Sequence, residues 1–265
     1  MYGADWAAAG YVAAHQAPGP IGHFFRGRVA LVAEILAGHP GGALLDAGCG
    51  PGIMVRHLAD RRPGEFAITG LDRSGAMIAE ARRILGDAPG VELRVGRIEA
   101  MPSHDARYDA VVVMGVLEYV EVVAALREVA RVTRPDGVVT VTMLNPWSPY
   151  RTWERAVYLP VRRMRSIAEK LLGVPPERRR GEWRNCVRLL GERDLTRLMR
   201  AVGLSPQRTV YFDMNLLVPP IDRMVPGLAV TLERLLAPLT RTRLRRLATS
   251  YAVVARRDGA PAGRG

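Results

Sequence analysis

A glycine-rich turn constrains this chain more than any other stretch of its sequence. Leu44 and Leu45 form a short apolar run that suits a buried strand, and Gly48 and Gly50 follow at once. Because glycine adopts positive φ and has no Cβ, these two can form an abrupt turn and let a ligand approach the backbone. Apolar residues with helical spacing resume at Ile53. The stretch therefore predicts a strand, a turn and a helix, the setting in which a glycine motif binds a ligand.

The spacing of the glycines differs from the dinucleotide-binding fingerprint. That fingerprint is Gly-x-Gly-x-x-Gly and would need glycine at position 53, where Ile53 stands. The pattern here is Asp-x-Gly-x-Gly-x-Gly, and it begins at Asp46. Residues 45–52, Leu-Asp-Ala-Gly-Cys-Gly-Pro-Gly, closely resemble the first motif of the class I S-adenosylmethionine-dependent methyltransferases, of the small-molecule type. A glycine-rich turn that binds no ligand is the alternative.

The resemblance implies that S-adenosylmethionine binds at this turn. Asp46 would receive the ammonium of the cofactor's amino-acid tail, directly or through water. Asp72 closes a second predicted strand over residues 66–72 and matches the family's second cofactor contact. At that position a carboxylate can accept hydrogen bonds from both ribose hydroxyls. The alternative for Asp72 is a capping or turn acid.

Two further strand ends complete the expected cofactor site. After a predicted strand over residues 91–96 the family has an acid for the adenine amine, but this chain has Arg97, so that contact is not expected from its side chain. Ligands bind outside the carboxyl ends of parallel strands, which places the end of a strand over residues 108–113 at the cofactor. The residues expected to bind the cofactor are Asp46, Gly48, Cys49, Gly50, Gly52, Asp72, Arg73, Met77, Arg97, Ile98, Glu99, Met114 and Gly115.

These patterns predict an α/β fold, a Rossmann-like doubly wound seven-stranded sheet. The sheet is expected to be mostly parallel, with one antiparallel strand over residues 250–255 and with helical cap insertions. The expected segments are an N-terminal helical lid (1–40), a cofactor-binding core (41–145), a helical cap insertion (146–190), the end of the core with a second basic helical insertion at 214–248 (191–257), and a disordered tail (258–265).

The formal net charge of +12 is concentrated in two segments. Residues 151–188 hold 11 basic and 4 acidic residues, and residues 234–257 hold 7 Arg and no acid. Since guanidinium groups bind phosphate and carboxylate well, we expect a small-molecule acceptor that is anionic or lipophilic, such as an isoprenoid diphosphate, a lipid or a carboxylated natural product. Docking on an anionic membrane surface would also suit this charge. A solvated arginine-rich surface is the alternative.

Methyl transfer requires an acceptor held close to the methyl carbon, and an oxygen acceptor also needs a general base. The candidates for catalysis near the predicted strand ends are His23, Glu118 and Tyr119. The residues expected to contact the acceptor are Tyr11, Asn145, Trp147, Tyr150, Arg178 and Arg179. A structural role is the alternative for each of them.

Other protein classes remain open at this point. An RNA methyltransferase would use the positive charge on phosphates, but no RNA-recognition signature is visible. A protein that binds S-adenosylmethionine without catalysis is the other alternative. The two cysteines do not form a disulfide framework, and no signal peptide, membrane span or metal-binding motif is apparent. We therefore expect a cytoplasmic protein that uses no metal, with peripheral membrane contact as a further option.

Overall fold

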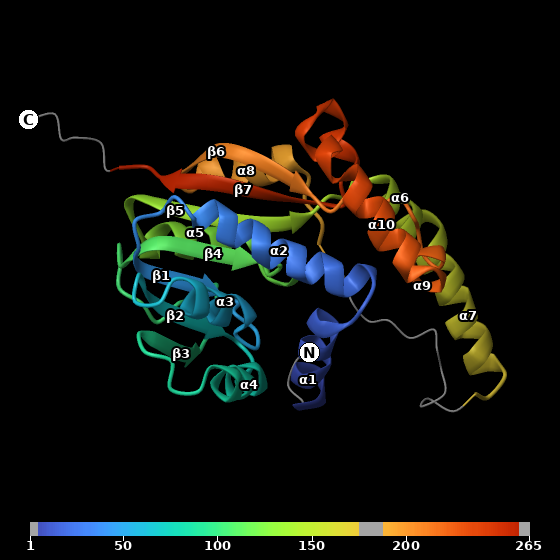
Figure 1. Cartoon of the computed structure of the whole chain (residues 1–265), viewed down its shortest axis with the longest axis horizontal. Helices are drawn as coiled ribbons and strands as arrows, with labels where there is room; N and C mark the ends of the chain where they lie inside the picture. The colour runs from blue at the N-terminus through green and yellow to red at the C-terminus, as the bar shows by residue number, and fades with distance from the viewer. Residues whose placement is uncertain (1–4, 175–187, 260–265) are drawn as a thin grey trace, which may run out of the picture.

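A seven-stranded sheet forms the centre of the computed structural model, which describes residues 5–174 and 188–259 (Figure 1). The strand order is β3-β2-β1-β4-β5-β7-β6, and only β7 runs antiparallel to its neighbours. The predicted Rossmann-like sheet is therefore confirmed. The strands are β1 (Gly42–Ala47), β2 (Phe66–Asp72), β3 (Val91–Val95), β4 (Tyr108–Met114), β5 (Thr133–Leu144), β6 (Leu204–Phe212) and β7 (Ser250–Arg257).

Helices cover both faces of the sheet. The helices α2, α3 and α4 bury one hydrophobic core against it, and α5 and α8 bury the other. The helices are α1 (Asp5–Gln16), α2 (Pro20–Leu36), α3 (Ile53–Arg61), α4 (Gly75–Leu85), α5 (Val122–Val132), α6 (Pro149–Trp153), α7 (Leu159–Leu171), α8 (Glu192–Ala201), α9 (Ile221–Met224) and α10 (Pro226–Leu236).

Strand β4 shows why the sequence folds into three layers. Val111 and Val113 point into the core under α5 and α8, whereas Ala110 and Val112 point into the core under α2 and α3. All four side chains are buried, because a parallel strand covered on both faces needs apolar residues at every position.

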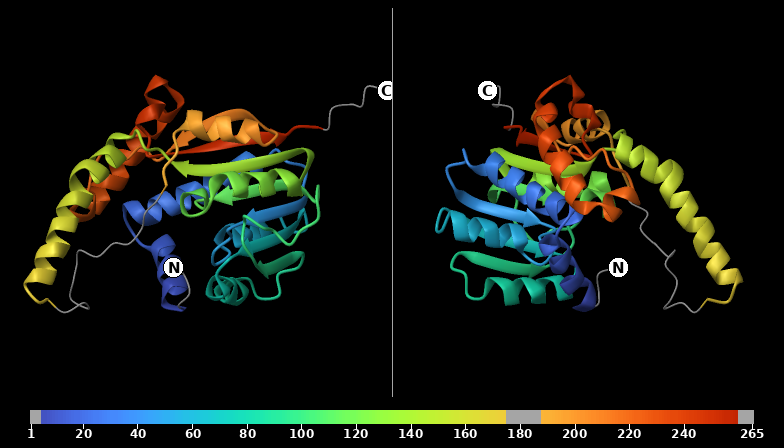
Figure 2. Two further views of the ribbon diagram at one scale, coloured as in Figure 1. Left: turned by 180° about the vertical axis from the view of Figure 1, so that it is seen from behind. Right: turned by 45° about the vertical axis from the view of Figure 1, so that its right-hand side comes forward.

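The two insertions lie beside the carboxyl end of the sheet. The first contains α6, a π-helical turn η2 (Glu154–Tyr158) and α7, and Figure 2 shows α7 extending away from the sheet. The second contains α9, α10 and two 3-10 segments, η4 (Ala237–Arg241) and η5 (Arg243–Leu247). A hydrogen bond from Arg223 Nη1 to Tyr158 Oη (3.1 Å) joins the two insertions.

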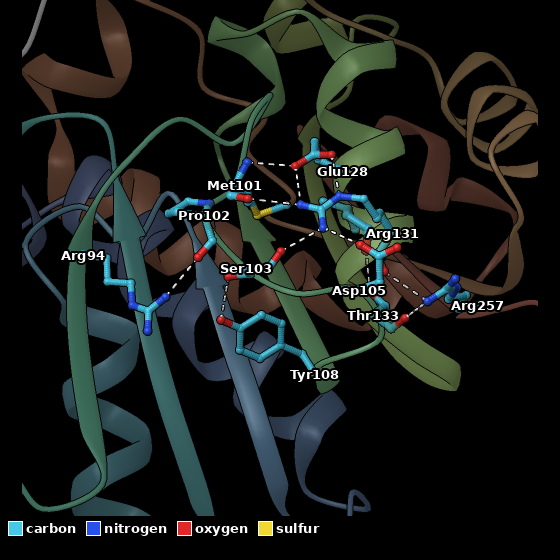
Figure 3. Close-up of polar contacts among 11 residues, drawn as sticks. Arg94, Met101, Pro102, Ser103, Asp105, Tyr108, Glu128, Arg131, Thr133 and Arg257 are labelled. Atoms are coloured by element: carbon cyan, nitrogen blue, oxygen red, sulfur yellow. Dashed lines mark hydrogen bonds and ion pairs between the residues drawn. The ribbon is translucent and has the colours of Figure 1, made fainter.

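Arg131 on α5 holds the opposite end of the sheet together (Figure 3). Its guanidinium donates to the carbonyl oxygens of Ser103 (2.8 Å) and Met101 (3.1 Å), which belong to the loop before β4. It also forms ion pairs with Asp105 (2.6 Å) and Glu128 (2.7 Å). One side chain thus fixes the loop to α5 at the amino ends of β4 and β5.

Replacing Arg131 should therefore lower stability without disturbing the other end of the sheet. We expect Arg131→Gln to reduce the free energy of unfolding by about 2 kcal/mol, because hydrogen bonds to charged groups contribute more than neutral ones. Urea denaturation checks the value. Arg127→Gln, at an exposed position on the same helix, is the control and should change stability by less than about 0.5 kcal/mol. Equal effects of the two substitutions would contradict the role given to Arg131.

Candidate active site

A cavity of about 640 Å³ lies at the carboxyl ends of the parallel strands. Its walls come from the ends of β2, β4 and β5, from the turn after β1, and from helices outside the sheet. The helices α1 and α2 form one side, and α6, η2 and α9 contribute to another. The cavity therefore lies where the strand order changes direction, the place at which open α/β sheets bind ligands.

The glycine turn forms part of the cavity floor. Gly48 has φ +87°, and its N–H donates to the Leu71 carbonyl oxygen (2.7 Å). A Cβ at Gly48 would lie 2.2 Å from Val116 Cγ2, so no side chain fits there. Gly50 has φ +53°, but its nearest neighbour to an added Cβ is Tyr11 Cε1 at 3.9 Å. Packing therefore requires the first glycine, whereas the second leaves open space next to the cavity.

Asp72 fixes this turn. Its Oδ2 accepts a hydrogen bond from the Gly50 N–H (2.9 Å), and its Oδ1 accepts one from the Ser74 N–H (2.8 Å). The side chain also lines the cavity. Since each carboxylate oxygen has two lone pairs, Asp72 can still accept hydrogen bonds from a ligand.

Asp46 lies behind the cavity wall and is only 1% exposed. Neither carboxylate oxygen has a hydrogen-bond partner among residues 5–174 and 188–259. Burial, together with nearby Asp72, raises the pKa of Asp46 to about 7, while Arg28 acts in the opposite direction. A buried and unpaired carboxylate is unfavourable, so Asp46 fits a ligand that brings positive charge to this end of the cavity.

Arg28 is a site residue that the sequence did not reveal. It is buried on α2, and its Cζ lies 5.2 Å from the ring centres of both Phe24 and Phe25. Its Nη2 donates to Tyr11 Oη (3.2 Å), and a Cβ at Gly115 would lie 2.3 Å from its Nη1. Its Nε has no hydrogen-bond partner in the described part of the chain. Gly115 thus leaves room for a buried guanidinium that can bind a carboxylate.

The structure gathers most of the predicted cofactor residues around the cavity. Beyond those already described, Arg73, Met77, Ile98, Glu99, Met114 and Gly115 line it. Arg97 does not, because its side chain is mostly exposed and forms an ion pair with Glu99 (3.3 Å). Glu99, and not residue 97, is thus the acid that lines the cavity after β3.

Cys49 and Gly52 have packing roles outside the cavity. Cys49 Sγ lies against Gly70 on β2, and burial raises the pKa of its thiol. Gly52 begins α3 with φ +78°, and a Cβ there would press on Leu85 (3.0 Å) and Ala81 (3.1 Å) of α4. Both residues support the glycine turn by packing on its side away from the cavity.

Of the predicted catalytic residues, Glu118 and Tyr119 line the cavity and His23 does not. Glu118 follows β4 in a 3-10 turn, is buried, and has no partner for Oε2 among the described residues. Burial raises the pKa of Glu118, while Arg28 and Arg151 oppose the shift. His23 instead faces Glu233, with Nδ1 3.1 Å from Oε2.

Some of the residues predicted to contact the acceptor line the cavity, and others lie outside it. Tyr11 and Tyr150 line the cavity, and Tyr150 Oη donates to Asp222 Oδ2 (2.8 Å). Asn145 lies outside it, because its amide nitrogen donates to the carbonyl oxygens of Arg246 (2.9 Å) and Ala248 (2.8 Å). Trp147 is 77% exposed. Arg178 and Arg179 lie outside the described residues.

Three other arginines line the cavity. Arg151, Arg155 and Arg223 come from α6, η2 and α9 and line its wall. Arg151 forms an ion pair with Glu154 (2.6 Å), and its Nε is unpaired among residues 5–174 and 188–259. Within those residues no group of three or more His, Cys, Asp or Glu is placed to hold a metal ion.

Comparison with known proteins identifies the domain around this cavity. Residues 44–137 match a family described as a methyltransferase domain. Ubiquinone biosynthesis O-methyltransferase of Methylocella silvestris is 34% identical over 174 residues, which cover 64% of this chain and 61% of that protein. The chain spans less than two thirds of the length of the curated relatives it matches, with 30%, 61%, 48% and 55% for four of them.

Solved structures share the fold. A chain of the complex between the Haloferax volcanii Trm112 methyltransferase activator and a methyltransferase aligns with TM-score 0.61 and 18% identity, over 96% of this chain and 97% of that one. The geranyl diphosphate C-methyltransferase of Streptomyces coelicolor, in complex with Mg²⁺, geranyl diphosphate and S-adenosyl-L-homocysteine, aligns with TM-score 0.54 and 19% identity, over 86% and 79%.

The family match covers β1 to the start of β5, and it includes the glycine turn, Asp72 and the end of β4. These segments form the floor of the cavity, and the fold around them aligns with that of the solved neighbours. Residues 44–137 are therefore a methyltransferase domain, and the chain is similar to class I S-adenosylmethionine-dependent methyltransferases in sequence and in fold.

Proposed function

We propose that this protein transfers a methyl group from S-adenosylmethionine to an oxygen of a small lipophilic acceptor that carries an anionic group. The observation that carries the proposal is Glu118. Its buried carboxylate lies on the cavity wall directly after β4, and Oε2 is unpaired in the described part of the chain. Such a group can accept the proton that an acceptor hydroxyl or carboxyl loses.

In this proposal the glycine-turn end of the cavity holds the cofactor, which supplies a methyl carbon on a sulfonium for in-line displacement. Asp72 accepts hydrogen bonds from the ribose hydroxyls, and Glu99 accepts one from the adenine amine beside Ile98. Arg28 binds the carboxylate of the amino-acid tail. Asp46, ionised behind the wall, stabilises the positive charge of the ammonium.

The other end of the cavity holds the acceptor. Phe24, Leu159 and Leu189 provide apolar walls, and Arg151, Arg155 and Arg223 provide guanidinium groups. A molecule with an apolar body and a carboxylate or phosphate would satisfy both kinds of wall. The name of the ubiquinone biosynthesis relative and the geranyl diphosphate bound to a structural neighbour support a lipophilic acceptor.

Glu118→Gln tests the proposed base. We expect turnover to fall by about 10²- to 10⁴-fold, because the amide cannot accept the acceptor's proton, while S-adenosylhomocysteine still binds. Since burial raises the pKa of Glu118, wild-type turnover should increase with pH as this carboxyl ionises, and the variant should lose that increase. The readout is the S-adenosylhomocysteine formed from S-adenosylmethionine in the presence of each acceptor in a panel of prenylated phenols, carboxylated phenols and geranyl diphosphate.

Glu121→Gln is the matched control, since Glu121 is an exposed acid three residues later, at the N-cap of α5. It should leave turnover and its pH profile unchanged. A wild-type profile in Glu118→Gln would contradict the proposed base. Turnover of geranyl diphosphate alone would contradict an oxygen acceptor, and S-adenosylhomocysteine binding without any turnover would favour a non-catalytic protein.

Gly50→Ala tests the position of the cofactor. The new Cβ meets no protein atom within 3.9 Å, so the variant should fold and yet bind S-adenosylhomocysteine at least about tenfold more weakly. Gly64→Ala is the control, because Gly64 has a similar φ of +75° with nothing within 4 Å and does not line the cavity. It should show the same backbone strain, about 1 kcal/mol in unfolding free energy, with normal binding. Calorimetric titration and urea denaturation separate the two effects.

The pKa of Asp46 predicts a pH dependence of cofactor binding. The carboxyl has a pKa of about 7 in the free protein, and a cationic ligand favours its ionised form. Binding below pH 7 should therefore release a proton, and affinity should fall by up to about tenfold per pH unit as pH decreases. Calorimetric titration in buffers of different ionisation enthalpy measures the number of protons released on binding. Asp46→Asn should abolish the release, exposed Asp60→Asn should keep it, and release that persists in Asp46→Asn would contradict the assignment.

A further inference from the structure

We propose that α7 docks this protein on an anionic lipid bilayer, with one face of the helix in the boundary between headgroups and acyl chains. The inference concerns the outer surface of the first insertion, on the side of α7 away from the cavity. It is independent of which acceptor is methylated.

An apolar stripe runs along the exposed face of this helical segment. Val157, Val161, Met164, Ala168 and Leu171 follow one another at intervals of four and three residues, which places them on one face. We call these five residues the α7 stripe. Val161 is 58% exposed, Met164 is 70% exposed and Leu171 is 83% exposed. Contiguous apolar surface of this kind marks a site of contact with a protein or a membrane.

The opposite side of the segment faces the cavity at its start. Arg155 and Leu159 line the cavity, and Ser166 is buried. An ordinary surface helix turns its apolar side toward the core, but here the apolar side points outward. Figure 2 shows α7 extending beyond the sheet and its helices, in keeping with the exposure of the stripe.

Basic side chains border the stripe on both sides. Arg163 precedes and Arg165 follows Met164, so each lies about 100° around the helix from it. Both are exposed, although Arg165 also forms an ion pair with Glu169 (2.8 Å). Arginine can bury its methylene stem beside apolar surface while its guanidinium reaches a phosphate. Apolar residues flanked by arginines are the pattern of a helix that lies in a membrane interface.

Charge selects the bilayer among the surfaces that could cover the stripe. A second copy of the chain would bring another pair of arginine borders against Arg163 and Arg165. Residues 175–187 contain four Arg and two Glu, so they are also net positive. An anionic bilayer complements both the α7 stripe and the arginines beside it, because acyl chains can cover the stripe and lipid phosphates can pair with the arginines. No described helix is long and apolar enough to cross a membrane, so the contact is peripheral.

Vesicle flotation of the full chain tests the proposal. We expect binding to vesicles of equal parts phosphatidylcholine and phosphatidylglycerol, weaker binding in high salt, and little binding to phosphatidylcholine alone. The double variant Val161→Glu/Met164→Glu should bind at least about tenfold more weakly, because it places two charges in the apolar boundary. Arg163→Glu/Arg165→Glu should lose the preference for anionic lipid.

Val95→Glu is the matched control, since Val95 is an equally exposed apolar residue on β3, away from α7. It should bind vesicles as the wild type does. All variants should bind S-adenosylhomocysteine normally, which shows that they fold and separates this proposal from the one on methyl transfer. Absence of binding to anionic vesicles would overturn the proposal, as would unchanged binding of Val161→Glu/Met164→Glu. A dimer in sedimentation that this variant abolishes, without vesicle binding, would assign the stripe to a second copy.

Discussion

The structure depends on how closely the turn after β1 passes between its neighbours. The Gly48 N–H donates to the Leu71 carbonyl oxygen at the end of β2, while Val116 after β4 fills the space that a side chain would need. The turn can therefore approach both neighbouring strands only because residue 48 lacks a Cβ. Asp72 then fixes Gly50 from the β2 side. The close approach of these three strand ends creates the floor of the cavity.

Arg28 acts electrostatically on both buried acids of the site, Asp46 and Glu118. Its positive charge opposes the pKa rise of Asp46 on one side and of Glu118 on the other. Yet neither Asp46 nor Oε2 of Glu118 has a hydrogen-bond partner within the described ranges. In the free protein the Asp46 carboxylate and Oε2 of Glu118 thus lack partners, and a ligand that supplies them recovers part of the cost of burying these groups. A zwitterionic amino-acid tail suits that arrangement, because it brings both an ammonium and a carboxylate to one place.

Sequence patterns predicted the parts of the molecule that depend on local spacing. The mostly parallel seven-stranded sheet, the glycine turn and the position of Asp72 follow from strand patterns that end in turns. Arg28 could not be found in this way, because Arg26 lies on the same predicted helix and only the packing of α2 over the sheet separates the two. Asn145 was expected at the acceptor, but its side chain caps backbone carbonyls of a segment more than 100 residues later in the chain. Contacts of that range leave no local pattern to recognise.

The positive charge of the first insertion illustrates how a helix divides one run of residues between two environments. Arg155 and Arg163 contribute equally to the net charge of the segment, and composition alone does not distinguish them. Helical periodicity turns Arg155 toward the cavity, where a guanidinium can meet an anionic group, and turns Arg163 toward the border of the exposed stripe. A net charge is therefore a poor guide to partners until the faces are known. Once they are known, the same insertion can recognise a small anion on its inner side and a lipid surface on its outer side.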